Sequence, residues 1–227
     1  MKYTEVAGVY RRTNGYLKAK DGSPSPVLAA PGQELPDVVG VSQAHIPTAQ
    51  DQGQLGDCVY QTLRELMTGL VLRQGQPEKM FSAVAPYWWG RNLDGVAPTD
   101  DAGSTCSTAI QVATSTGVPR KEAWDDNKPF ALEPDQAAVD DAKKHQAILS
   151  FALPDLFTMR ACLNQGFGFG FGFRCQNQLM SDEAANTGSV TFTDDPTAWD
   201  GSGHAVSVWR HDKNKVVGAY PGAFLCL

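Results

Sequence analysis

The stretch DQGQLGDCV, residues 51–59, runs directly into an amphipathic helical pattern and so places Cys58 at the start of a helix. A helix N-terminus carries about half a positive charge and unpaired backbone N–H groups, which favour a thiolate over a thiol. In such a place the pKa of a cysteine can fall from about 8.5 to roughly 3.5–7.5, especially beside a protonated histidine. We therefore predict that Cys58 is a nucleophile. The alternative is a small, buried, apolar cysteine, as free cysteines often are.

The same stretch predicts groups that stabilise a tetrahedral oxyanion. Gly53 and Gly56 permit a tight turn and a close backbone approach. A substrate carbonyl could then reach both the backbone N–H of Cys58 and the side-chain amide of Gln52, six residues earlier. Nucleophile and oxyanion donors would come from one short segment.

His204 is the candidate general base among the four histidines. Two glycines precede it and an alternating apolar run follows it, in GSGHAVSVW, which is typical of a strand. We expect the imidazole to project from the first residue of that strand towards a cleft. The alternative is a histidine whose hydrogen bonds are satisfied in the core. The remaining histidines lie in polar or charged segments: His45, His145 and His211.

Together these two segments resemble a known family. DQGQLGDC is similar to the glutamine-to-cysteine segment of papain-like (C1) cysteine peptidases, and GSGHAVSV is similar to their histidine strand. The separation between Cys58 and His204 also fits papain-type enzymes. Further similarity to bacterial and viral members spreads the resemblance over residues 35–227, at Leu35-Pro36-Asp37, Ile46-Pro47, residues 102–126 and residues 156–173.

The resemblance implies an α+β papain-like fold and acyl-transfer chemistry. A mostly helical half, about 35–150, and a mostly antiparallel β half, about 151–227, would meet at the cleft that holds the catalytic residues. Cys58 would attack a peptide or isopeptide carbonyl, and His204 would take and return the proton. Gln52 and the Cys58 N–H would hold the oxyanion, and water would then hydrolyse the thioester. The expected substrate is a polypeptide, and no cofactor is expected.

The sequence departs from the papain pattern at three places. Val59 follows the nucleophile where papain has tryptophan, and Leu55 stands where papain has a disulfide cysteine. The family's asparagine, carried in an Asn-Ser-Trp sequence after the histidine strand, has no match, and its role is not carried over to Asn214. Because that third group orients the imidazole, its absence predicts a poor enzyme.

Two other functions therefore stay open. The first is a catalytically weak or inactive papain-like module that serves as a structural or interaction component of a larger assembly, such as a phage or viral particle. The second is transglutaminase or amidase chemistry on the same cysteine and histidine. Residues 1–34 form a polar arm, rich in Gly, Pro, Ser and Lys, that does not resemble an independent domain. We expect this arm to dock on an assembly partner or across the cleft.

The composition argues against nucleic-acid-binding and membrane proteins. The 227 residues, 42% of them hydrophobic, suffice for one sizeable domain or two subdomains that share a cleft. A net charge of −6 gives no basic surface for nucleic acid, so we expect no such partner. No apolar run approaches the roughly 18–20 residues of a membrane span, and MKYTEVAGVYRR lacks the apolar core of a secretory signal peptide. We expect a cytoplasmic or virion-associated protein without membrane contact.

The five cysteines form no CxxC pair and no metal-ligand spacing, so no metal site is expected. Their odd number leaves at least one thiol without an internal partner, which favours a reducing compartment. Helices are expected near 58–73, within 78–93, near 104–116 and near 134–145. Strands are expected at the GFGFGFGF run from Gly166 and near 188–194, 204–210 and 215–225. That run places phenylalanines on one face and glycines on the other, so another element can approach the glycine face closely.

Overall fold

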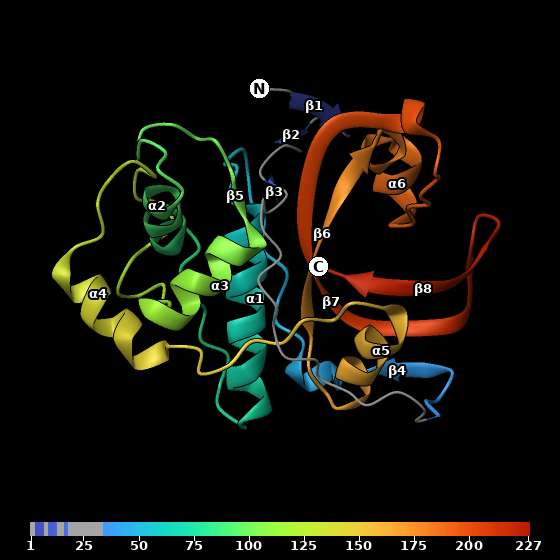
Figure 1. The fold of residues 1–227 in the computed structure, drawn as a ribbon, viewed down its shortest axis with the longest axis horizontal. Coiled ribbons are helices and arrows are strands. Elements are labelled where there is room, and N and C mark those ends of the chain that lie inside the picture. The colour runs from blue at the N-terminus through green and yellow to red at the C-terminus, as the bar shows by residue number, and fades with distance from the viewer. Residues whose placement is uncertain (1–2, 7–8, 13–15, 18–33) are drawn as a thin grey trace.

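The structure is a computed structural model that describes residues 34–227 in full and the backbone of residues 3–6, 9–12 and 16–17. Its helices lie mainly in one half and its long strands in the other, with helix α1 at the boundary between them (Figure 1). The helices of the first half are α1 (Cys58–Arg73), α2 (Val84–Leu93), α3 (Cys106–Ser115) and α4 (Gln136–Ala142).

Helix α1 is the central element because it is buried on two sides. It packs against strands of the sheet on one side and against α2 and α3 on the other. It begins at the residue that the sequence predicts, Cys58, and no side chain caps its first turn. The core cluster around its N-terminal turn contains Val59 and Tyr60 together with residues of α2, α3 and the sheet. This packing fixes the position of the first turn between the two halves.

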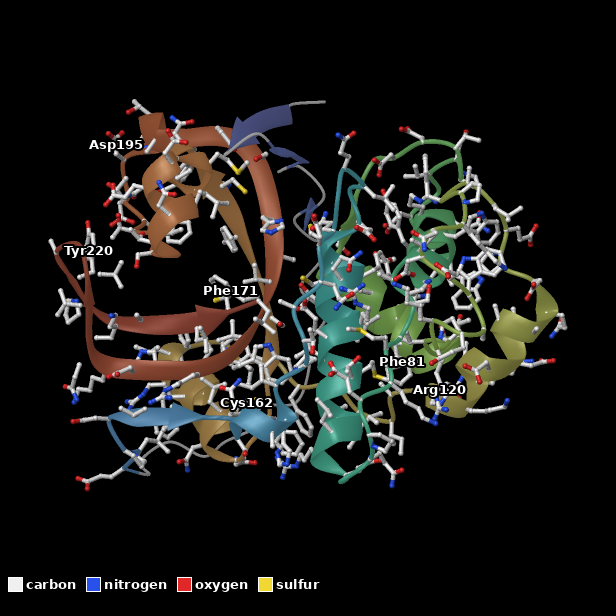
Figure 2. The ribbon with its side chains drawn as sticks, turned by 180° about the vertical axis from the view of Figure 1, so that it is seen from behind. Phe81, Arg120, Cys162, Phe171, Asp195 and Tyr220 are labelled. Atoms are coloured by element: carbon white, nitrogen blue, oxygen red, sulfur yellow. The ribbon has the colours of Figure 1, made fainter. Side chains whose placement is uncertain are left out.

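The second half is an antiparallel sheet with the order β4-β7-β6, and β8 pairs with β7 as well. Its strands are β4 (Val38–Gly40), β6 (Phe169–Gln176), β7 (Trp199–Val217) and β8 (Tyr220–Cys226). β7 is long and strongly curved, and its first part pairs with β6 while its second part pairs with β4 and β8 (Figures 1 and 2). Helix α5 (Leu156–Asn164) lies against β4 and begins with a capping box formed by Asp155 and Thr158. The predicted α+β class is confirmed.

The glycine face of β6 meets its neighbours as the sequence predicts. A Cβ atom added at Gly170 would lie 3.0 Å from the Thr62 side chain of α1, and one added at Gly168 would lie 2.8 Å from the ring of Trp209. Either atom would crowd a packed neighbour, so bare glycine lets α1 and the tryptophan approach the strand. The opposite face carries Phe171 and Phe173, whose rings stack with their centroids 5.8 Å apart.

Two strand predictions were wrong. Residues 188–194 form no strand, because Gly188 ends helix α6 (Asp182–Thr187) in the left-handed conformation and the chain then follows side-chain bonds. There the Gln176 side chain bonds both the N–H and the carbonyl of Thr193, as a strand backbone would. The strand that contains His204 starts earlier than expected, since β7 begins at Trp199. His204 therefore lies within a strand and not at its first residue.

The described parts of the N-terminal arm are short strands. β1 (Tyr3–Val6) and β2 (Val9–Arg12) form an antiparallel pair. β3 (Tyr16–Leu17) pairs in parallel with β5 (Ser104–Thr105), and β3 also lies beside β7. The expectation that the arm docks across the cleft otherwise falls on residues outside those that the structure describes.

Short 3-10 turns complete the described chain at Gln43–His45, Lys143–His145, Asn177–Met180 and Pro196–Ala198. The second of them forms the end of the helix expected near 134–145, whose α-helical part is α4 alone. In the described part of the chain no helix has both the length and the apolar character needed to cross a membrane.

Candidate active site

Cys58 lies at the point where α1 meets β7. It is the first residue of α1, and the residue is only 1% exposed. A backbone hydrogen bond joins its thiol to Ala205, the residue that follows His204 in β7. The fold therefore brings together the two sequence segments that were singled out for chemistry, although they lie far apart along the chain.

The first turn of α1 presents a free backbone donor beside this thiol. The N–H groups of Tyr60 and Gln61 both donate to the carbonyl of Asp57, at 2.7 and 3.0 Å. The N–H of Cys58 precedes them and has no acceptor among the described residues, as expected for the start of a helix. It can therefore donate to an oxyanion that forms on a substrate carbonyl bonded to the sulfur.

The charge state of Cys58 differs from the sequence-based expectation. Burial raises the pKa of the Cys58 thiol above its usual range, and nearby Asp57, Cys106 and Cys175 act in the same direction. The bond from Ala205 acts the other way but is outweighed. The reason is desolvation, because an anion with almost no water around it is costly even at a helix N-terminus. In this arrangement Cys58 is a neutral thiol at neutral pH.

Asp57 is a buried acid that no sequence motif singles out. One carboxylate oxygen accepts a hydrogen bond from Gln61 Nε2 at 2.7 Å, and the other has no partner among the described residues. Burial raises the pKa of Asp57 to about 7, and the Gln61 bond only partly offsets this. The residue directly before Cys58 therefore changes charge near neutral pH.

His204 is a neutral side chain on β7. Its ring meets Phe173 of β6 edge-on, with ring centroids 5.9 Å apart. Burial lowers the pKa of His204 to about 4. Its Nδ1 atom is buried and has no hydrogen-bond partner within the described part of the chain. Thiol and imidazole are thus both uncharged here, and no ion pair joins them.

The Gln52 side chain stabilises the turn that precedes Cys58. Its side-chain Nε2 donates to the carbonyl of Leu55 at 2.7 Å, and Gly53 takes the left-handed conformation, with φ at 65°, that its turn requires. A primary amide carries two N–H donors, so one remains for another acceptor. The part played by Gln52 at an oxyanion stays a prediction.

A second segment, residues 101–105, borders the Cys58 segment, and no sequence motif predicts this contact. Asp101 accepts a hydrogen bond from the backbone N–H of Gly56 at 3.0 Å, and Ser104 Oγ lies 3.1 Å from the Tyr60 hydroxyl. These contacts join residues some 45 positions apart in the sequence. A local pattern contains no signal for such a contact.

A cavity of about 620 Å³ runs along α1, between α3, the start of β6 and the segment 149–153. Its lining is mainly apolar. Val59 and Gly172 line it, so one end of the cavity lies near Cys58. Val59 directly follows Cys58, and Gly172 is paired with Ala205 in the sheet. Cys106 and Ile110 of α3 also line it. The cavity is large enough for a bulky apolar group.

The five cysteines are all free thiols. Within the described ranges no cluster of three or more His, Cys, Asp and Glu side chains is arranged to hold a metal ion.

No model of a known protein family matches this sequence, and no curated protein matches it. Solved structures do. Xylellain, a cysteine protease from Xylella fastidiosa, is 21% identical with a TM-score of 0.73, over 94% of this chain and 90% of that one. The chain has the papain-like fold.

Two further structures with the papain-like fold are similar. Procathepsin B from Trypanosoma congolense is 14% identical with a TM-score of 0.68, over 92% of this chain and 73% of that one. The cysteine protease and lectin-like domains of Cwp84 from Clostridium difficile are 16% identical with a TM-score of 0.66, over 95% of this chain and 48% of that one. The papain-like fold that the sequence resemblance implies is confirmed.

Proposed function

We propose that the protein is a cysteine peptidase-type hydrolase that cleaves peptide or isopeptide bonds. The observation that carries the proposal is the contact between the Cys58 thiol, at the start of α1, and the backbone of Ala205, next to His204. The papain-like fold supports it, because the similar structures are cysteine proteases. A polypeptide is the corresponding substrate.

The proposed reaction is a two-step acyl transfer. His204 removes the thiol proton of Cys58, and the sulfur attacks the substrate carbonyl carbon to form a tetrahedral oxyanion. The Cys58 N–H and the free amide hydrogen of Gln52 donate to that oxyanion. Collapse expels the amine, which takes the proton from His204 and leaves a thioester. Water, deprotonated by His204, then attacks the thioester and releases the carboxylic acid and the thiol.

The cavity along α1 points to the kind of polypeptide that would bind. Its lining is mainly apolar and one end lies near Cys58, so a bulky apolar side chain close to the scissile bond would fill it. Burying such a side chain favours binding by about 1.5–3 kcal/mol. We infer a preference for substrates with aromatic or large aliphatic residues at that position.

The described conformation is a closed one in this proposal. Cys58 is almost completely buried, and the thiol and imidazole are both neutral. The strand β3 of the arm pairs with β5, which immediately precedes the cavity-lining Cys106. We infer that the arm covers the site through strand β3, and that its displacement hydrates Cys58, lowers the pKa of the thiol and permits the ion pair with His204 to form.

The second candidate is an inactive papain-like module within a larger assembly, with the arm as its contact to a partner. The unpartnered Nδ1 of His204 favours it, because an imidazole without an orienting group is a poor base.

One experiment separates the two candidates. The full chain and a variant lacking residues 1–34 are incubated with a fluorogenic peptide that carries phenylalanine near the cleaved bond, each beside its Cys58→Ala counterpart. A hydrolase gives turnover above the Cys58→Ala control, most clearly without the arm. Turnover equal to that control in both forms assigns the protein to the inactive class.

A further inference from the structure

The loop of residues 101–105 holds the nucleophile segment on both sides of Cys58. Two residues before Cys58, the Gly56 N–H donates to the Asp101 carboxylate, at 3.0 Å to one oxygen and 3.3 Å to the other. Two residues after it, the Tyr60 hydroxyl lies 3.1 Å from Ser104 Oγ. All four residues are buried. Hydrogen bonds from this one loop therefore hold the chain both before and after Cys58.

Asp101 is itself held in place by a second set of contacts. The Tyr87 hydroxyl of α2 donates to the same carboxylate oxygen at 2.5 Å, and it accepts the N–H of Gly103 at 3.0 Å. Arg91, one helical turn further along α2, donates to the carbonyls of Pro98 and Asp100. The loop is thus fastened to α2, and the carboxylate cannot move without breaking buried hydrogen bonds.

A hydrogen bond to a carboxylate is shorter and roughly twice as strong as one between neutral groups. The bond from Gly56 therefore restrains the peptide planes that lead into Cys58. The Cys58 N–H lies two residues on and has no acceptor among the described residues. Its direction depends on those planes, and a misplacement of about 1 Å at a reacting group can cost about 10²-fold in rate.

We propose that Asp101 is a positioning residue for acyl transfer at Cys58, and that it aims the Cys58 N–H at the oxyanion through its bond to Gly56. This inference rests on the proposed function. Asp101 touches no reacting atom, and it acts through the loop that carries the nucleophile.

The test compares two reactions of the same thiol in the full chain. Acylation by the p-nitrophenyl ester of an N-blocked phenylalanine passes through an oxyanion and is followed by the release of nitrophenol. Alkylation by iodoacetamide forms no oxyanion and is followed by intact mass. The ratio of the two rate constants reports on the oxyanion donors and cancels changes in the accessibility or pKa of Cys58.

Three variants make the comparison specific. Asp101→Ala removes both acceptors for Gly56, and Asp101→Asn keeps one oxygen that can accept the same bond. Asp126→Asn is the matched control, because the Asp126 carboxylate is part-buried and also accepts backbone N–H bonds, at the start of α2. Its ion pair with α1 is formed with Arg64, beyond the first turn that carries Cys58, and any effect of it on the pKa of Cys58 cancels in the ratio. Thermal unfolding shows which variants are folded.

We expect the ratio of acylation to alkylation to fall about 10²-fold in Asp101→Ala and about 3- to 10-fold in Asp101→Asn, and to stay unchanged in Asp126→Asn. If Asp101→Ala does not fold, the two asparagine variants decide the question. An unchanged ratio in the Asp101 variants, or an equal fall in Asp126→Asn, overturns the inference while the proposed function stands. A parent chain that alkylates Cys58 but never forms an acyl-enzyme overturns both.

Discussion

The thiol of Cys58 is hydrogen-bonded to the backbone of Ala205, the neighbour of His204 in β7. This contact joins the helical half to the sheet half at the residue proposed as nucleophile. The same burial that creates the contact keeps the thiol protonated and the imidazole neutral. A papain-like fold and a protonated Cys58 thiol are therefore present together.

The first prediction concerns the order in which the thiols react. In the full chain, exposed Cys226 should react with iodoacetamide before buried Cys58. Because the pKa of Cys58 is raised, its labelling rate should climb about tenfold per pH unit between pH 7 and 9, as its thiolate fraction grows. Deleting residues 1–34 should make Cys58 the fastest thiol near pH 7. Peptide mapping of the labelled chains checks this, and an unchanged order after the deletion would show that the arm does not cover the site.

The second prediction concerns the oxyanion. Gln52→Ala should lower acylation by the nitrophenyl ester about 10²- to 10³-fold and leave alkylation of Cys58 largely unchanged, since a donor aimed at a developing charge acts in the transition state. Gln50→Ala is the matched control, because the Gln50 amide bonds only carbonyls of neighbouring residues outside the site. Equal behaviour of the two variants would limit Gln52 to its structural bond with Leu55.

The third prediction concerns the cavity along α1. Ile110 lines it, whereas the adjacent Gln111 of α3 does not and is exposed. Ile110→Arg places a charge in the apolar lining, so kcat/KM for a phenylalanine-containing peptide should fall about tenfold or more. Gln111→Arg should leave it unchanged. A peptide with alanine at the same position should be far less affected. Equal losses for both peptides would mean that the cavity does not hold the substrate side chain.

The fourth prediction concerns Asp57. Burial raises its pKa from 3.8 to about 7, so the folded protein binds this proton more tightly than the unfolded chain. Its contribution to stability is complete below pH 3.8 and is lost as the pH rises to about 7. Asparagine carries no titrating proton, so Asp57→Asn removes this pH-dependent loss of stability. The melting temperature of the variant minus that of the parent should therefore increase between pH 4 and 7. Above pH 7 this difference should stay constant. A pH-independent difference would contradict the raised pKa.

The sequence predicted most of the fold because its strongest signals are local. The helical spacing placed the start of α1 at Cys58, and the glycine alternation predicted the close approach of α1 to β6 at Gly170. The strand predicted near Thr193 was wrong because a non-local contact decides the structure there. Its alternating residues are typical of a strand, but the side chain of Gln176 occupies its backbone hydrogen-bonding groups.

The roles of the candidate site residues stay predictions. Cys58 and His204 were chosen by residue type and local context, and the fold places their segments together. The protonation of Cys58 could not be predicted, because it depends on how much water the assembled protein excludes. Asp101 could not be predicted either, because its role arises from a contact with Gly56 that exists only in the folded chain.

The most direct test of the central claim is to trap the thioester. The chain without residues 1–34 is mixed with the phenylalanine nitrophenyl ester, quenched in acid and examined by intact mass and peptide mapping. The account predicts one acyl group per chain, on Cys58, absent from the Cys58→Ala variant and strongly reduced in the His204→Ala variant. No acyl adduct, or adducts spread over the other four cysteines and independent of His204, would contradict it.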